Sequence, residues 1–364
     1  MISLADPQFG DEEVDAVRDV LEDGRVADGP EVRRFESAFA DYCGAETGVA
    51  AANGTVALHA ALEGLGIGAG DKVVTTPLSF VASSNAIRIA GAEPVFADVD
   101  PLTYNLDPAA AERAVRRTDA DALLVVHLYG LPADMGAFRD IAADEDVHLI
   151  EDAAQAHGAA YRGQRVGSFG DAAAFSFYPT KNMTTGEGGM VLADDEEVAE
   201  RAASYVNHGR TKDEAYAHER VGSNYRMTSL AAAIGRVQLE RLPSWIEARR
   251  ENAARLSATL DDAPVVRPPV EPDGRRHAYH QYTVRCADRE KLREHLSEAG
   301  VSSGVYYPTP IHRLGAYDGY DAETPVADRA TDEVLSLPIH PNVTAEDIDQ
   351  IADAIRSAPK TIAP

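Results

Sequence analysis

At 364 residues, the chain is long enough for one large domain and a smaller one, and its 45% hydrophobic and 26% charged residues are ordinary for a soluble globular protein. It contains no run of about 18 apolar residues, and its first residues lack a basic segment followed by an apolar one. We therefore expect no membrane-spanning helix and a cytoplasmic location. The net charge of −26 argues against nucleic acid or an anionic membrane as a partner.

The acidic excess also indicates adaptation to high salt, where dissolved ions screen the repulsion between carboxylates. Only five of the 34 basic residues are lysines. A GC-rich genome is the alternative explanation, but it accounts for the few lysines and not for the many carboxylates. The two cysteines, Cys43 and Cys286, have no metal-binding or redox spacing, so we expect no metal site.

The first two-thirds of the chain alternates between short apolar runs and amphipathic stretches. We expect strands at 72–76, 94–98, 122–127, 147–150, 172–177 and 189–192, and helices at 55–65, 83–89, 108–116, 135–144 and 196–206. This alternation predicts an α/β domain around a mostly parallel sheet. Ligands of such sheets bind at the carboxyl ends of the strands.

The last third of the chain has a different pattern. Two helices are expected at 228–242 and 245–260, separated by Pro243. A proline-rich segment follows, and then strands at 279–284 and 304–307 and helices at 289–299 and 344–357. These elements predict a smaller C-terminal α+β domain. With a boundary between residues 240 and 265, we divide the chain into a large domain, 1–245, and a small one, 246–364.

Lys181 stands out because lysine is rare in this chain. It follows the expected strand at 172–177 and precedes the turn Gly186-Glu187-Gly188-Gly189. Arginine would serve any role that needs only positive charge, whereas lysine is able to lose its proton and form an imine with a carbonyl group. We therefore interpret Lys181 as a Schiff-base lysine.

A second candidate, Asp152, ends the expected strand at 147–150 together with Glu151. In pyridoxal-phosphate enzymes, an aspartate beside the pyridine nitrogen keeps that nitrogen protonated, so that the ring acts as an electron sink. One expected strand lies between Asp152 and Lys181, which allows both to face one crevice. The alternative is that Asp152 only caps the next helix.

Asn53-Gly54-Thr55 links a strand of small residues to a helix start, which is a favourable place for a phosphate group. Ser176, five residues before Lys181, offers a second hydroxyl. A helix cap and an ordinary strand serine are the alternatives. Phe80 follows another strand, where its ring is placed either to stack on a planar ligand or to join the core.

In combination, these segments resemble the nucleotide-sugar aminotransferases of the DegT/StrS type. The resemblance extends over about residues 6–357 and depends on Asn53-Gly54-Thr55, Ser79-Phe80, Glu151-Asp152-Ala153-Ala154-Gln155, Ser176-Phe177 through Lys181-Asn182, Gly186-Glu187-Gly188-Gly189 and Asn224-Tyr225-Arg226-Met227. It implies the aspartate aminotransferase-like fold (fold type I), with pyridoxal 5′-phosphate bound in active sites shared across a homodimer.

The resemblance also assigns roles to single residues. Lys181 would bind the cofactor and later move a proton between cofactor and sugar carbon, Asp152 would pair with the pyridine nitrogen, and Gln155 would contact the 3-oxygen. Phe80 would stack on the ring. The phosphate would be held by Gly54, Thr55 and Ser176, joined by Asn224 of the second subunit.

For the substrate, the resemblance implies Tyr307 and His312 near the sugar, and Arg210, in the loop 207–212, near the nucleotide diphosphate. A solvated turn is the alternative for that loop. The segments 127–130 and 183–190 resemble perosamine synthase-type enzymes most, which aminate C4 of a 4-keto-6-deoxy nucleotide sugar. Those enzymes often carry glutamate where this chain has Gln155.

The expected function is transfer of an amino group, with glutamate as the expected donor, to a nucleotide-linked keto sugar for polysaccharide biosynthesis. Amination at C3 is an alternative. A sugar dehydratase of the same family would carry histidine in place of Lys181. An alternative of another class is a non-catalytic regulatory protein that senses sugar or cofactor.

Overall fold

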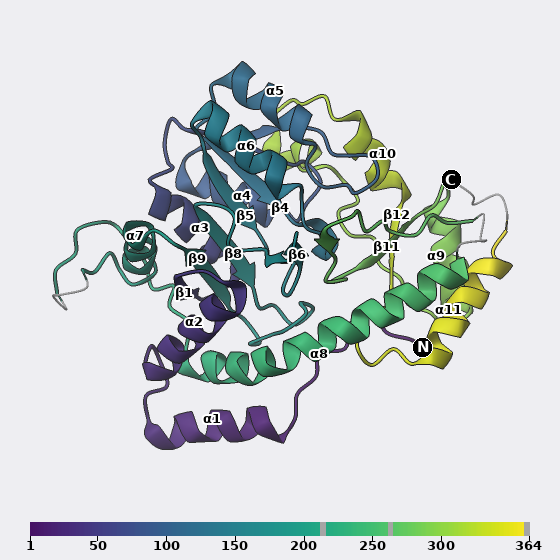
Figure 1. Cartoon of the computed structure of the whole chain (residues 1–364), viewed down its shortest axis with the longest axis horizontal. Helices are drawn as coiled ribbons and strands as arrows, with labels where there is room; N and C mark the ends of the chain where they lie inside the picture. Colours follow the sequence, from purple (N-terminus) through teal and green to yellow (C-terminus); the bar gives the residue numbers. More distant parts are fainter. Residues whose placement is uncertain (212–215, 261–264, 360–364) are drawn as a thin grey trace.

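A seven-stranded sheet forms the centre of the fold in the computed structural model, which describes residues 1–211, 216–260 and 265–359 (Figure 1). The strand order is β1 (Thr47–Ala51), β9 (Gly189–Ala193), β8 (Ala172–Ser176), β5 (His148–Asp152), β4 (Ala122–Val126), β2 (Lys72–Thr75) and β3 (Glu93–Phe96). Only β9 runs against the other strands. The expected α/β architecture with a mostly parallel mixed sheet is confirmed.

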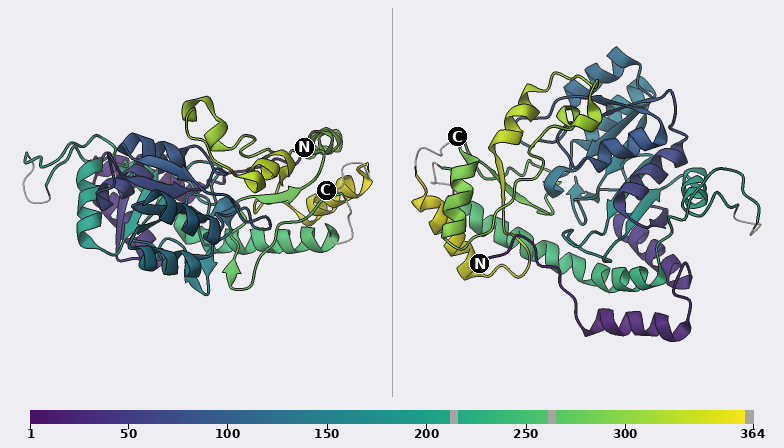
Figure 2. Two further views of the ribbon diagram at one scale, coloured as in Figure 1. Left: turned by 90° about the horizontal axis from the view of Figure 1, so that it is seen from above. Right: turned by 180° about the vertical axis from the view of Figure 1, so that it is seen from behind.

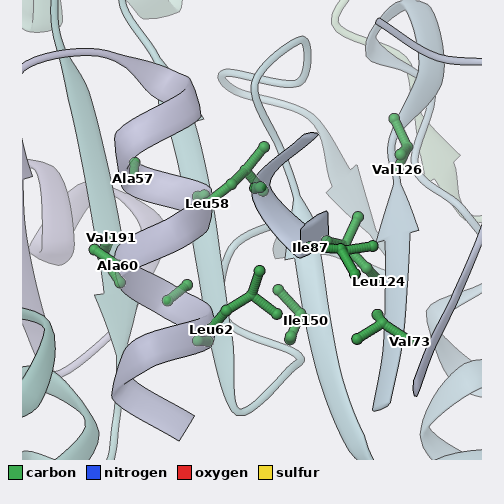
Figure 3. Close-up of a cluster of buried hydrophobic side chains, with 14 of the residues drawn as sticks. Ala57, Leu58, Ala60, Leu62, Val73, Ile87, Leu124, Val126, Ile150 and Val191 are labelled. Atoms are coloured by element: carbon green, nitrogen blue, oxygen red, sulfur yellow. The ribbon is translucent and has the colours of Figure 1, made fainter. Parts of the chain in front are cut away.

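Helices cover both faces of this sheet, because successive side chains of each buried strand point in opposite directions. Leu124 and Ile150 pack with the helices α3 (Gly54–Leu65), α4 (Ala82–Ala90) and α7 (Glu196–Val206) on one face. Leu123 and Leu149 pack on the opposite face, which is covered by α2 (Pro30–Cys43), α5 (Pro108–Thr118), α6 (Met135–Glu145) and part of α8. Figure 3 shows Leu62 of α3 beside Ile150, with Leu58 one turn away on the same side of the helix. The same alternation decides which face Glu151 and Asp152 occupy.

The helix α8 (Ser229–Leu260) is continuous, so the predicted break at Pro243 is wrong. Proline removes one backbone hydrogen bond and costs about 3 kcal/mol inside a helix. The buried residues Leu239, Leu242 and Ile246 nevertheless keep their helical spacing across it. Burial of this continuous face in two cores outweighs the loss of one bond. The proposed domain boundary at 245 falls inside α8 and stays a prediction.

A second core lies at the far end of α8, toward α9 (Arg289–Glu298) and α11 (Ala345–Ser357) (Figure 1). Its antiparallel pair joins β11 (Tyr282–Arg285) to β12 (Val334–Leu337). The strand predicted at 304–307 is wrong, because only Gly304 forms a single bridge, to Ser336. The strand β12 was not predicted.

The remaining elements are α1 (Asp11–Asp23), which packs on α8, the small sheet of β6 (Ala160–Tyr161), β7 (Gln164–Arg165) and β10 (Arg275–Arg276), the short 3-10 turns η1 (Leu128–Gly130), η2 (Ile311–Arg313) and η3 (Gly315–Tyr317), and α10 (Pro325–Glu333). Ala327 and Ala330 of α10 belong to the core of the large sheet. The C-terminal third therefore contacts both cores.

Between α7 and α8 the chain leaves the body of the molecule as an arm, whose described residues are 207–211 and 216–228 (Figure 2). Bridges between Asn207 and Asn224 and between Arg210 and His218 join its two sides. Lys212, the last residue of the predicted diphosphate loop, lies outside the described residues. Among the described helices, none is both long enough and apolar enough to cross a membrane.

Candidate active site

The carboxyl ends of β5 and β8 meet the amino end of α3 at one edge of the sheet. A methyl group added at Gly54 would lie 2.6 Å from Cβ of Ser176, so α3 begins directly against the end of β8. The side chain of Asn53 caps the helix by accepting a hydrogen bond from the N–H of Val56 at 3.0 Å. The amides of a first helical turn have no partners within the helix and favour an anion. The predicted phosphate residues Gly54, Thr55 and Ser176 are thus brought together.

Asp152 is 5% exposed and lies on the face of the sheet that α3 and α4 cover. One carboxylate oxygen accepts a hydrogen bond from the hydroxyl of Ser83 at 2.7 Å, and the other accepts one from the N–H of Ala154 at 3.2 Å. Burial raises the pKa of Asp152, while Ser83, the Ala154 amide and Lys181 act in the opposite direction. The residue is therefore a buried carboxylate that is held in one orientation.

Glu151, the neighbouring carboxylate, points to the other face and has a structural role. It accepts hydrogen bonds from the N–H groups of Gly167 at 2.8 Å and Phe169 at 2.7 Å, and it lies 2.9 Å from Nε2 of His127. The N–H of Ala133 donates to Nδ1 of His127 at 3.1 Å, so Nε2 carries the proton and donates to Glu151. Glu151 therefore anchors the loop before β8 and does not face the site.

Lys181 follows β8 in a turn in which its N–H donates to the carbonyl oxygen of Tyr178 at 2.9 Å. Burial lowers the pKa of its amine to about 8, although the carboxylate of Asp152 acts against this shift. An ordinary lysine has a pKa near 10.4 and is less than about 1% neutral at pH 8. The amine of Lys181 therefore loses its proton at a lower pH than that of an ordinary lysine, and the charge of Asp152 acts on it.

Gln155 and Tyr307 lie side by side, although 152 residues separate them in the chain. Nε2 of Gln155 lies 3.0 Å from the hydroxyl of Tyr307, and the N–H of Tyr129 donates to Oε1 of Gln155 at 2.8 Å. The ring of Tyr307 lies 6.3 Å from the ring of Tyr129 and 6.3 Å from that of Phe80. Phe80 is 57% exposed at the rim, where its ring is open to a ligand.

Three predicted residues lie apart from this group. His312 lies in η2, with its ring 5.8 Å from that of Phe96. Arg210 and Asn224 lie on the projecting arm, where Asn224 is exposed. Within the described residues, no hydrogen bond or ring contact joins these three to Lys181 or Asp152. Their substrate and phosphate roles stay predictions.

Sequence reasoning missed Ser83 and Tyr129. Ser83 is recognisable only after α4 is placed beside β5, because it lies 69 residues from its partner Asp152. Tyr129 acts through its backbone N–H. Its left-handed conformation (φ 58°) is rare for tyrosine, so the residue type does not predict it. Neither residue therefore carries a local sequence signal.

These residues fit pyridoxal phosphate. A fixed, buried carboxylate suits a protonated pyridine nitrogen, and the amine of Lys181 suits a carbonyl carbon. The start of α3 with Ser176 suits a phosphate, and the missing side chain at Gly54 lets the helix begin directly against Ser176, where an added methyl group would clash.

Comparison with known proteins gives the same assignment. Residues 7–356 match the model of the DegT/DnrJ/EryC1/StrS aminotransferase family. The chain is 41% identical to a pleiotropic regulatory protein of Geobacillus stearothermophilus, covering 93% of this chain and 91% of that protein. It is also 41% identical to the dTDP-3-amino-3,4,6-trideoxy-alpha-D-glucose transaminase of Streptomyces venezuelae (94% and 90% covered) and 38% identical to the GDP-perosamine synthase of Caulobacter vibrioides (97% and 97% covered).

The structure is also similar to a solved one. The crystal structure of S. venezuelae DesV in complex with a ketimine intermediate matches with a TM-score of 0.92 at 40% identity, covering 95% of this chain and 94% of that one. The chain belongs to the DegT/DnrJ/EryC1/StrS aminotransferase family.

Proposed function

We propose that the protein is a pyridoxal-phosphate-dependent aminotransferase that transfers an amino group from L-glutamate to C4 of a 4-keto-6-deoxy nucleotide sugar. The observation that carries this proposal is that Lys181 and Asp152 lie near enough for their charges to interact, on the same edge of the sheet as the helix start at Gly54 and Ser176. When bound, pyridoxal phosphate supplies an electron sink for breaking the bond between carbon and hydrogen.

The chain's own residues prepare this chemistry. Asp152 would hold a negative charge near the ring nitrogen of the bound cofactor, and Ser83 fixes the direction of that carboxylate. Lys181 takes up and returns the proton at the reacting carbon, which requires an amine whose pKa lies close to the working pH. The start of α3 at Gly54, together with Ser176, would form the phosphate cradle and hold the phosphate of the cofactor.

The choice of C4 rests on the segments 127–130 and 183–190, which resemble perosamine synthase-type enzymes. The relatives include a named 3-amino sugar transaminase and a named perosamine synthase at 41% and 38% identity, so amination at C3 is the main alternative. Incubation of the purified protein with glutamate and a panel of 3-keto and 4-keto nucleotide sugars tests the proposal. We expect turnover with a 4-keto-6-deoxy sugar, and exclusive turnover of 3-keto sugars would contradict the choice of C4.

We further propose a homodimer in which each arm completes the other subunit's site. The arm projects from the body, and it exposes Asn224 next to its bridge to Asn207 (Figure 2). On a partner's site, Asn224 would reach the phosphate and Arg210 the nucleotide diphosphate. Sedimentation of the purified protein tests the dimer, and a monomer with full activity would contradict it.

A pH profile tests the state of Lys181. Because its pKa is lowered to about 8, the amine stays neutral to a lower pH than that of an ordinary lysine. The rate at which the apoprotein captures pyridoxal phosphate should rise with pH to a midpoint near 8, and below it fall about tenfold per pH unit. Stopped-flow absorbance between pH 6 and 10.5 measures this rate. A midpoint near 10.4 would show that burial does not act on Lys181.

A substitution at Gly54 tests the phosphate cradle. The added methyl group of Gly54→Ala would lie 2.6 Å from Cβ of Ser176, so the end of β8 and the start of α3 must move apart. We expect the Kd of pyridoxal phosphate to rise at least about fivefold, since overpacking costs about 1–3 kcal/mol. Gly68→Ala is the matched control, because its methyl group would meet nothing closer than the carbonyl oxygen of Ala90 at 3.5 Å. Equal affinities of the two variants would place the phosphate elsewhere.

A further inference from the structure

The orientation of the Gln155 side chain follows from its neighbours. A backbone N–H only donates, so the atom that faces the N–H of Tyr129 at 2.8 Å is the amide oxygen. The amide nitrogen must then face Tyr307, whose hydroxyl lies 3.0 Å away. An amide nitrogen also only donates. The hydroxyl oxygen of Tyr307 is therefore an acceptor in this contact.

Tyr307 consequently keeps its own proton for another partner. A phenol has one O–H donor. Within the described residues, the hydroxyl of Tyr307 forms a hydrogen bond with Gln155 alone, and in that bond it accepts. Burial and the nearby Asp152 raise the pKa of Tyr307, so the group stays protonated at neutral pH. Its ring lies between those of Tyr129 and Phe80, at the rim of the site.

Two residues next to Gln155, Tyr129 and Tyr307, have strained backbone conformations. Tyr129 and Tyr307 have φ angles of 58° and 66°, which lie in a region that residues other than glycine rarely occupy. Such strain persists where the surrounding structure holds it, often at functional sites. Here the carbonyl oxygen of Tyr129 accepts a hydrogen bond from the N–H of Gln281 at 3.1 Å, and the two tyrosine rings are parallel within 6°. Tyr129 is thus a positioning residue for Gln155.

We propose that Gln155, oriented by the backbone of Tyr129, leaves the O–H of Tyr307 free to donate a hydrogen bond to an oxygen of the keto sugar beside the reacting carbon. This inference rests on the proposed function. A glutamate at position 155 would reverse the hydrogen bond, because both carboxylate oxygens accept and Tyr307 would donate to one of them. The residue at position 155 therefore determines whether Tyr307 is available to the sugar.

A double-mutant cycle tests the coupling of Gln155 and Tyr307. Sugar binding is measured by calorimetry on the cofactor-loaded Lys181→Ala protein, which holds the substrate without turnover, and kcat/KM is measured on the same substitutions with Lys181 present. With Gln155 in place, Tyr307→Phe should weaken sugar binding about tenfold, the effect of one lost hydrogen bond. In the Gln155→Glu background, the same change should have an effect within about twofold. Any effect of the Gln155→Glu substitution on the cofactor is common to both Tyr307 backgrounds and cancels in the cycle.

The glutamate half-reaction, followed by cofactor absorbance, should change by less than about twofold in Tyr307→Phe, because the hydroxyl serves the sugar. Equal losses of sugar affinity in both backgrounds would overturn the proposal, and so would a loss confined to the glutamate half-reaction. If the native protein aminates the keto sugar but the cycle shows no coupling between Gln155 and Tyr307, only this inference is contradicted. A native protein that aminates no keto sugar would instead contradict the proposed function and the inference together.

Discussion

Replacing Lys181 with alanine should lower turnover by on the order of 10⁴-fold or more, with the phosphate cradle and Asp152 still intact. Alanine removes both the amine that is able to form an imine and the base that moves the proton at the reacting carbon, and general-base catalysis alone contributes up to about 10⁴-fold. The burial that lowers the pKa of Lys181 to about 8 is what fits this amine for both roles. Steady-state kinetics measure the loss of turnover, and equilibrium dialysis measures whether the cofactor still binds.

Two matched variants identify the chemical property that matters. Lys181→Arg keeps the positive charge but not the removable proton, and it should be as inactive as Lys181→Ala. Lys291→Ala, which removes an exposed lysine paired with Asp288, should retain the activity of the native protein. Substantial turnover by Lys181→Ala would remove Lys181 from the reaction.

Asp152→Asn should lower kcat on the order of 10³-fold. Asparagine has nearly the same shape and still accepts a hydrogen bond from Ser83, but it carries no charge to keep a pyridine nitrogen protonated. The apoprotein should not lose stability, because the substitution removes a buried charge whose desolvation is unfavourable. Kinetics and a thermal melt of the same preparation therefore separate the electrostatic role from folding.

Asp171→Asn is the control for Asp152→Asn, since Asp171 lies just before β8, at the opposite end of the sheet, where it accepts a hydrogen bond from the N–H of Leu149. Its activity should stay near that of the native protein. Ser83→Ala should have a smaller effect than Asp152→Asn, because the charge remains and only its orientation loosens. Similar activities of Asp152→Asn and Asp171→Asn would contradict the pairing of Asp152 with the cofactor.

Much of the large sheet was predictable because its strands are short, apolar and separated by amphipathic helices. The predicted break at Pro243 shows the limit of local signals. The buried positions Leu239, Leu242, Ile246 and Ala253 keep one helical spacing across the proline, and this periodicity indicates a single helix. The apolar periodicity, and not the proline, corresponds to the observed helix.

The small unit was harder to predict because its strand pairing is non-local. The strand β12 at Val334–Leu337 pairs with β11, about fifty residues earlier in the chain, and is buried along its whole length. The apolar, aromatic run at 304–307 had the local pattern of a strand but forms only the bridge from Gly304. Contacts between distant segments, which local patterns do not contain, decided between the two.

The candidate site shows the same contrast between features that the local sequence predicts and features that depend on contacts between distant segments. Lys181, Asp152 and Gly54 have residue types that the proposed chemistry demands, so the sequence predicts them as site residues. Ser83 and Tyr129 act through position alone, one by a hydroxyl on the neighbouring helix and the other by a backbone N–H in a strained turn. Only the structure brings these two to the residues on which they act.

The most direct test of the account is the absorbance of the cofactor-loaded protein during the two half-reactions. Addition of glutamate alone should change the visible absorbance once and release one 2-oxoglutarate per site, and addition of the keto nucleotide sugar should restore the original spectrum and yield the amino sugar. A spectrum that glutamate leaves unchanged, with no 2-oxoglutarate formed, would contradict an aminotransferase and favour a protein that only senses its ligands.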